Sequence, residues 1–282
     1  MNPSVTRHQI TPVAGSVVDP HTGLEMYELS HPWGHGVPSY PGYADVRMER
    51  SVTHAQHGVM TQRIRTVMHT GTHVNAPIHL VQQAAGIGTL PLGLFFGNAV
   101  VLDIPKNQWE LITAADLESA TPAVKVGDIV LIVTGWHRRY SDSQEYFAHG
   151  PGLSPEAAQW LCDGGAKLVG VDTAYVDHPL ATQLANHRGG PHAPYLVPRY
   201  ESETGRIASE DFPQLNPAHK VLLEAGIPTI ENVGGDVDLI LGKRLTVHSF
   251  PWKWLEGDAC PVRLVALRDD QGDYRIETGE AK

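Results

Sequence analysis

The stretch His69-Thr-Gly-Thr-His73-Val-Asn75-Ala-Pro77-Ile-His79 is the segment around which we expect the rest of the chain to fold. Alternate side chains of an extended chain point to one face, so His69, His73, Asn75 and His79 project together. A helix would also pair His69 with His73, but the threonines, glycine, valine and proline between the histidines disfavour a helix. We therefore predict a strand end that runs into a tight loop, and we interpret the stretch as a metal site.

Composition and charge narrow the class of protein. The 282 residues are 41% apolar, which is enough for a sizeable core in one or two domains. A net charge of −10 argues against nucleic acid or an anionic membrane surface as the main partner. The sequence shows no secretory signal and no apolar run near the roughly 20 residues of a membrane span. Two cysteines suit core thiols rather than a disulfide framework, so we expect a cytoplasmic protein.

Hydrophobic patterns predict strands alternating with helices along the chain. Helices are expected at 113–119, 154–163 and 216–225, where N-cap residues precede them. The expected strands are 59–68, 97–104, 128–136, 167–173, 227–233, 239–241, 244–250 and 262–267. This alternation predicts an α/β (α+β) core in a single domain, residues 26–282, after an N-terminal arm, residues 1–25.

Residues 185–216 stand apart because they are rich in Gly, Pro, His and charged residues and show little periodicity. Structureless loops of this length are uncommon in compact domains unless they are functional. The segment is interpreted as a lid, an arm that reaches a neighbouring subunit, or a surface excursion.

A second pair of polar residues lies in the predicted helix and strand near the C-terminus. His219 follows Asn216-Pro217 in the first turn of a helix, where the helix dipole disfavours the charged imidazolium form. Glu231 comes twelve residues later, at the end of the strand that this helix precedes. The spacing allows the two side chains to meet, although a packed or capping histidine is the commoner role.

Together these residues resemble a known family. The 69–79 stretch is similar to the H-x-G-T-H-x-D-x-P-x-H signature of the cyclase superfamily of metal-dependent hydrolases. That superfamily includes bacterial kynurenine formamidases, isatin hydrolases and proteins like cyclic imide hydrolases. The resemblance extends over most of residues 28–268, including 134–136, 151–158, 170–178 and 219–232.

The resemblance implies roles for the matching residues. His69 and His73 would be metal ligands, His219 and Glu231 would bind a second metal or surround it, and His79 would be the general acid/base. Glu231 is thereby counted among both the metal-site and the catalytic residues. The family also implies a β-rich core of the swivelling β/β/α type with surrounding helices, usually assembled as homodimers or larger homo-oligomers.

One residue departs from the signature. The aspartate expected at its seventh position is Asn75 here, and a neutral amide is a weaker ligand than a carboxylate that bridges two cations. We therefore predict one tightly bound metal, with Asn75 as a weak ligand and any second metal dependent on Glu231. Zn²⁺ suits imidazole ligands best, and Mn²⁺ is the alternative.

These groups predict hydrolysis of a small-molecule substrate. A histidine-bound metal activates water and polarises a carbonyl, and His79 could carry the proton to the leaving nitrogen. The favoured substrate is a small cyclic amide or imide, or an N-acyl compound. Trp33, Tyr40 and Trp136 are candidates for an apolar pocket wall, and Arg188, with His187 and His192, for binding a product carboxylate. For the three aromatic residues, packing in the core is at least as good an interpretation. For Arg188, His187 and His192, a solvent-exposed loop is at least as good an interpretation.

Three alternatives stay open at this point. A lactone hydrolase would use the same nucleophile, and a non-hydrolytic cyclase or dehydratase would need one metal as the electrophile, which Asn75 would permit. A purely structural metal site is the third alternative. His79 argues against it, because a structural site does not need an additional polar group beside the metal.

Overall fold

A ten-stranded mixed sheet organises the computed structural model, which describes residues 15–189 and 192–269. The strand order is β1-β2-β14-β12-β6-β8-β10-β11-β5-β13. The strands are β1 (Val17–Val18), β2 (Glu25–Glu28), β5 (His73–Asn75), β6 (Phe96–Asp103), β8 (Ile129–Val133), β10 (Leu168–Val171), β11 (Thr229–Glu231), β12 (Arg244–His248), β13 (Ala259–Pro261) and β14 (Val265–Arg268). The expectation of an α/β fold with a β-rich core is confirmed.

The centre of the sheet is parallel and both flanks are antiparallel. Strands β6, β8, β10 and β11 pair in parallel, and helices connect them in sequence. These connecting helices are α2 (Ala114–Ser119), α4 (Pro155–Asp163) and α7 (Pro217–Glu224). Parallel neighbours require such crossovers, whereas the flanking strands can follow one another through shorter connections.

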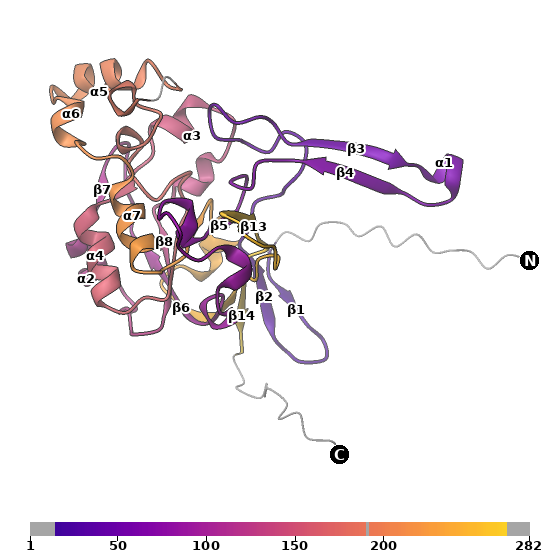
Figure 1. Ribbon diagram of the computed structural model, residues 1–282. Helices are drawn as coiled ribbons and strands as arrows, with labels where there is room; N and C mark the ends of the chain where they lie inside the picture. The colour runs from indigo at the N-terminus through magenta and orange to yellow at the C-terminus, as the bar shows by residue number, and fades with distance from the viewer. Residues whose placement is uncertain (1–14, 190–191, 270–282) are drawn as a thin grey trace, which may run out of the picture.

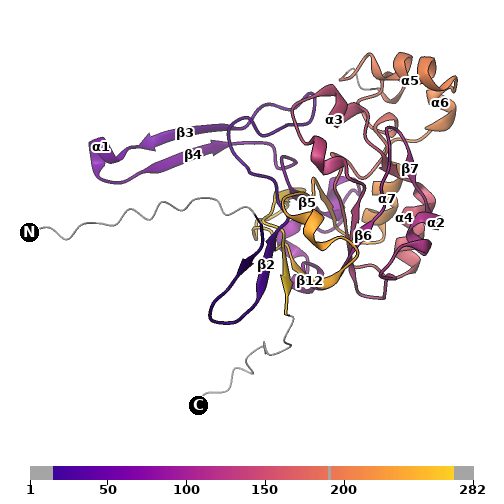
Figure 2. The same ribbon diagram turned by 180° about the vertical axis from the view of Figure 1, so that it is seen from behind.

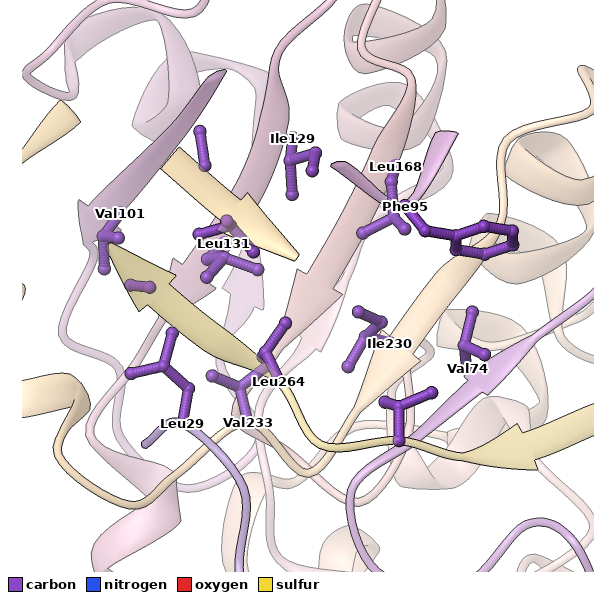
Figure 3. Close-up of a cluster of buried hydrophobic side chains, with 14 of the residues drawn as sticks. Leu29, Val74, Phe95, Val101, Ile129, Leu131, Leu168, Ile230, Val233 and Leu264 are labelled. Carbon is purple, nitrogen blue, oxygen red and sulfur yellow. The ribbon is translucent and has the colours of Figure 1, made fainter. Parts of the chain in front are cut away.

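Side-chain alternation along β8 divides the core into two layers. Ile129, Leu131 and Val133 belong to a cluster inside the curl of the sheet, while Val130 and Ile132 belong to a second cluster with residues of α2, α4 and α7. Successive side chains of a strand point to opposite faces, so a strand buried on both faces is apolar throughout. Figure 3 shows the first cluster, where side chains from both flanks meet those of the central strands, among them Leu29, Val74, Val101, Leu131, Ile230 and Leu264.

A two-stranded ribbon projects from this body in both views (Figures 1 and 2). It consists of β3 (Arg47–Val52), the short helix α1 (His54–His57) and β4 (Thr61–Arg65). The strand expected at 59–68 is therefore present, but its apolar face is not buried, since Met60 and Ile64 are each 48% exposed.

The other expected elements agree with the structure except at two places. The strand expected at 239–241 is wrong, because Val237–Ile240 forms a 3-10 helix. Residues 185–216 are not structureless, because α5 (Leu196–Thr204) and α6 (Ala208–Asp211) pack on a third apolar cluster with α3 (Gln144–Ala148). Of the expected arm at 1–25, residues 1–14 lie outside the described residues and 15–25 contain β1. A short pair, β7 (Leu111–Ile112) with β9 (Gly152–Leu153), completes the strands of the described chain.

The expected capping residues form capping hydrogen bonds at two of the three helix starts, whereas the side chain of Asn216 forms none at the start of α7. Thr113 and Asp116 form a reciprocal capping box at α2, and Ser154 caps α4 with Pro155 in its first turn. Within the described ranges, none of the helices has both the length and the apolar character that crossing a membrane requires.

Candidate metal centre

The histidine stretch forms a strand followed by a tight turn, as its residues predict. His73 and Asn75 begin and end β5, and a 3-10 helix at Pro77–His79 follows. Strand β11 pairs antiparallel with β5, so that Glu231 lies opposite His73. This register brings the Nε2 atom of His73 within 3.1 Å of the Oε2 atom of Glu231.

The hydrogen bonds of His73 leave one ring nitrogen available. Its Nδ1 lies 2.8 Å from the carbonyl oxygen of Gly71, which can only accept, so Nδ1 carries the hydrogen in the neutral ring. Nε2 is then a buried lone pair with no hydrogen-bond partner. It faces the Glu231 carboxylate, whose Oε2 lies 3.1 Å away. Two lone pairs at this distance repel each other unless a proton or a metal ion lies between them, and the group of imidazoles around one carboxylate fits a metal ion.

His219 approaches the same carboxylate from α7. Its Nδ1 lies 3.8 Å from Oε1 of Glu231, and its Nε2 lies 2.7 Å from the hydroxyl of Thr229. Asp177 fixes the start of α7 by accepting hydrogen bonds from the backbone amides of Ala218 (2.7 Å) and His219 (3.3 Å). Burial lowers the pKa of His219 to about 4, which keeps the ring neutral at physiological pH.

His69 and His79 complete the group on its other side. Their ring centroids are 4.2 Å apart, and the ring of His79 is 5.6 Å from that of His219. Burial and the neighbouring His69 lower the pKa of His79 to about 3, so its ring is neutral and can accept a proton. The structure thus brings together His69, His73, His79, His219 and Glu231.

Asp258 is a member of this group that sequence reasoning missed. Its Oδ2 lies 2.9 Å from the Nε2 of His69, and ligand atoms of His69, His79 and Asp258 all lie within 4.8 Å of one another. Asp258 is 189 residues from His69, and no motif spacing connects the two. The pairing of β13 with β5 brings them together, which a single sequence does not reveal.

Asn75 lies beside His219 and Thr229. It is fully buried, and its Nδ2 donates to the Thr229 hydroxyl at 3.2 Å and lies 3.5 Å from Nε2 of His219. Its side chain does not line the cavity at the site. The Oδ1 of Asn75 is buried and has no hydrogen-bond partner among the described residues.

A cavity of about 180 Å³ opens beside the histidines. Four aromatic side chains, from Tyr40, Tyr43, Phe147 and Tyr175, line it together with polar groups. No lysine or arginine of the described chain lines this cavity. The Tyr175 hydroxyl is buried and has no hydrogen-bond partner among the described residues, and burial raises its pKa well above the usual range, so it stays protonated.

Among the substrate-contact candidates from the sequence, the structure places only Tyr40 in the wall of this cavity. Trp33 packs against Gly71 and donates to the Thr70 carbonyl at 3.2 Å. Trp136 is 3% exposed and belongs to the third apolar cluster. Arg188 donates to the Pro213 carbonyl at 2.6 Å, which ties the 185–216 segment to itself.

The histidines beside Arg188 differ in their positions. His187 lies 3.3 Å from the Phe212 carbonyl, whereas the His192 ring lies edge-on to Tyr40 at 5.9 Å. Tyr43, Phe147 and Tyr175 are cavity residues that sequence reasoning missed, because aromatic residues outside a motif are equally typical of a core.

The chain matches one family and several characterised proteins. The family model described as "Putative cyclase" matches residues 27–178, just over half of the chain. A kynurenine formamidase from Salinibacter ruber is 30% identical over 210 residues, covering 73% of this chain and 78% of that protein. A kynurenine formamidase from Bacillus cereus is 27% identical over 248 residues, covering 86% of this chain and 96% of that protein.

Solved structures agree at the level of the fold. Isatin hydrolase A from Ralstonia solanacearum has a TM-score of 0.70 at 20% identity, covering 87% of this chain and 92% of that chain. An isatin hydrolase bound to the product analogue thioisatinate has a TM-score of 0.69 at 18% identity, with the same coverage. From the family match and the relative at 30% identity, we conclude that the chain belongs to the cyclase family.

Proposed function

We propose that this protein is a metal-dependent hydrolase that cleaves the C–N bond of a small cyclic amide or imide, or of an N-acyl compound. The observation that carries the proposal is the buried Nε2 of His73, which has no hydrogen-bond partner and faces the Glu231 carboxylate at 3.1 Å. The formamidases and isatin hydrolases among its relatives support an amide as the reacting group.

The ligand set consists of His69, His73, His219 and Glu231. Imidazoles with one carboxylate favour Zn²⁺, and Mn²⁺ is the second candidate. When bound, such a cation supplies Lewis acidity that lowers the pKa of water and polarises a carbonyl. Asn75 stays a weak additional ligand in this proposal, since only its Nδ2 contacts Thr229 and His219, while its buried Oδ1 has no hydrogen-bond partner among the described residues.

His79 and Tyr175 supply the remaining functional groups. The neutral His79 ring lies beside His69, where one of its nitrogens accepts the proton of the attacking water and returns it to the leaving nitrogen. The Tyr175 hydroxyl, which has no partner among the described side chains, donates to an oxygen of the substrate. The aromatic wall excludes water from the other faces of the substrate.

The cavity favours a neutral, planar substrate. Since a cavity of about 150 Å³ accommodates benzene, the 180 Å³ observed here suits a small ring system. N-formylkynurenine carries an amino-acid carboxylate, and none of the described residues that line the cavity is a lysine or arginine that could bind it. A cyclic lactam or imide avoids this unpaired charge.

A substrate panel tests the proposal. Isatin-like lactams, cyclic imides, N-formyl amines and small lactones are each incubated with the metal-loaded protein, and ring opening or deformylation is followed by chromatography. We expect the highest kcat/KM for a neutral cyclic amide or imide. If lactones are turned over faster than every amide, the proposal of an amide substrate is wrong and the protein is a hydrolase of cyclic esters.

The projecting ribbon supports a second copy of the chain as the partner. Residues 47–65 contain four arginines and one glutamate, so the ribbon carries +3 and the remaining chain −13. An isolated two-stranded ribbon is marginally stable in water, and its exposed Val59, Met60 and Ile64 favour a covering surface. We propose that the ribbon packs on the acidic body of a second subunit.

A further inference from the structure

The metal centre lacks an acid that the family signature would supply. The signature has an aspartate where this chain has Asn75, and the Asn75 amide contacts Thr229 and His219 rather than the cavity. Asp177 does line the cavity, but its two oxygens accept the backbone amides at the start of α7. Glu231 would then be left as the acid beside a divalent cation.

Asp258 supplies a carboxylate from the neighbouring strand. It directly precedes β13, whose residue Ala259 pairs with Asn75. The carbonyl of Asp258 accepts a hydrogen bond from the backbone amide of Ala76 at 2.8 Å, which fixes Asp258 against the histidine stretch. Its side-chain Oδ2 lies 2.9 Å from Nε2 of His69. Asp258 thus presents a carboxylate at the start of the strand that pairs with β5.

We propose that Asp258 is the second acid of the metal centre, that it takes the place of the aspartate missing at position 75, and that it acts through His69. An ionised carboxylate only accepts hydrogen bonds, so the hydrogen between the two groups belongs to Nε2 of His69. The neutral ring then keeps its lone pair on Nδ1, available to the metal. A carboxylate on the far side of a ligand histidine fixes its tautomer and orientation and raises its basicity.

Charge neutrality gives a second reason for this role. Glu231 and Asp258 together carry two negative charges, which balance a divalent cation among neutral histidines. Asp258 is a positioning residue, because its contact is with His69. The inference rests on the proposed function, since it requires that the protein bind a metal.

A comparison of two Asp–His pairs tests this role. Asp238 is a matched control, because it is 45% exposed and lies 3.2 Å from Nε2 of His137, far along the chain from the histidine stretch, whereas Asp258 is 48% exposed. Zn²⁺ affinity is measured by competition with a chromophoric chelator for the wild type, Asp258→Ala, Asp258→Asn and Asp238→Ala. The melting temperature of each metal-free protein reports any purely structural effect.

We expect Asp258→Ala to weaken Zn²⁺ binding by roughly 10- to 100-fold. Asp258→Asn should lose less Zn²⁺ affinity than Asp258→Ala, because its amide oxygen can still accept a hydrogen bond from His69. Asp238→Ala should bind Zn²⁺ with the affinity of the wild type. Adding Asn75→Asp to Asp258→Asn should restore the acid and most of the affinity. Wild-type affinity in Asp258→Ala, or equal losses in Asp258→Ala and Asp238→Ala, would overturn the inference while leaving the proposed function intact. A wild type that binds no Zn²⁺ or Mn²⁺ would instead refute the proposed function itself.

Discussion

The Nε2 atom of His73 and the Oε2 atom of Glu231 lie 3.1 Å apart across the antiparallel pair of β5 and β11. His73 donates its other ring nitrogen to the Gly71 carbonyl, so the two facing atoms are both acceptors when the ring is neutral. A buried pair of this kind is costly without a cation between the atoms. The register of the two strands therefore positions the central pair of the candidate metal centre.

Replacing Glu231 with glutamine should remove the charged member of this pair. The amide keeps the shape of the side chain but offers a weak neutral oxygen, so metal affinity should fall by more than roughly 100-fold, the upper range for loss of an outer-sphere partner. Isothermal titration calorimetry with Zn²⁺ measures the affinity of the variant and of the wild type. Affinity equal to that of the wild type would show that Glu231 is not a ligand.

His79→Gln should separate proton transfer from metal binding. The variant should retain its metal, because His79 is not in the proposed ligand set, while kcat falls by roughly 10²- to 10⁴-fold, the usual contribution of a general base. Metal content and steady-state rates are measured on the same preparation. A variant that turns over at the wild-type rate would exclude the role in proton transfer.

Tyr175→Phe should lower kcat/KM without a loss of stability. The hydroxyl has no hydrogen-bond partner among the described residues, so its removal breaks no hydrogen bond of the folded state. The substrate, in contrast, loses a hydrogen bond worth roughly 1 kcal/mol, which corresponds to an about fivefold lower kcat/KM. Tyr146→Phe is the control, because its hydroxyl donates to Oδ1 of Asn232 at 2.5 Å and its loss should lower the melting temperature. A large destabilisation by Tyr175→Phe would mean that its hydroxyl is bonded in the folded protein.

His178 should make the protein less stable in acid. The ring stacks on Phe212 at 4.0 Å, accepts from the Leu180 amide and lies 3.1 Å from the Trp109 carbonyl, to which it donates. Burial lowers the pKa of His178 to about 3, against 6.5 in the unfolded chain. Between these values only the unfolded state binds the proton, so stability falls as pH decreases, by about 1.4 kcal/mol per pH unit.

Urea unfolding of the metal-free protein at pH 7 and pH 5 measures this effect. His178→Gln should be less stable at pH 7, because it loses ring packing. Its stability should nevertheless depend less steeply on pH, because about one proton fewer is taken up on unfolding. An unchanged pH dependence would show that His178 takes up a proton in the folded state.

Replacing the ribbon residues 47–65 with a short Gly-Ser linker should reduce the size of the assembly. The ribbon carries the exposed Met60 and Ile64 and most of the local positive charge that the proposed contact uses. Light scattering after size exclusion should show dimers or larger species for the wild type and monomers for the variant. An assembly that survives the replacement must be held by another surface.

The sequence was informative where local chemistry determines the structure. Thr113 with Asp116, and Ser154 with Pro155, predicted the starts of α2 and α4, and the apolar run of β8 predicted its burial. The 69–79 stretch predicted a strand followed by a tight turn, which β5 and the following 3-10 helix confirm.

Long-range pairing was beyond the reach of a single sequence. Asp258 reaches His69 because β13 adds to β5, and no local pattern records that register. Trp136 and Tyr175 are both buried aromatic residues, and only tertiary packing decides that Tyr175 lines the cavity while Trp136 does not. The alternating pattern of residues 59–68 predicted a strand, but it did not reveal that the ribbon projects away from the body of the chain.

Metal-dependent hydrolysis of an amide is the central claim, and chelation with add-back tests it most directly. The purified protein is stripped with a chelator, and hydrolysis of the best amide or imide of the substrate panel is measured before and after addition of one equivalent of Zn²⁺ or Mn²⁺. We predict that activity disappears with the metal and returns with it. Full activity in the metal-free protein, or none on any amide after metal is restored, would contradict the account.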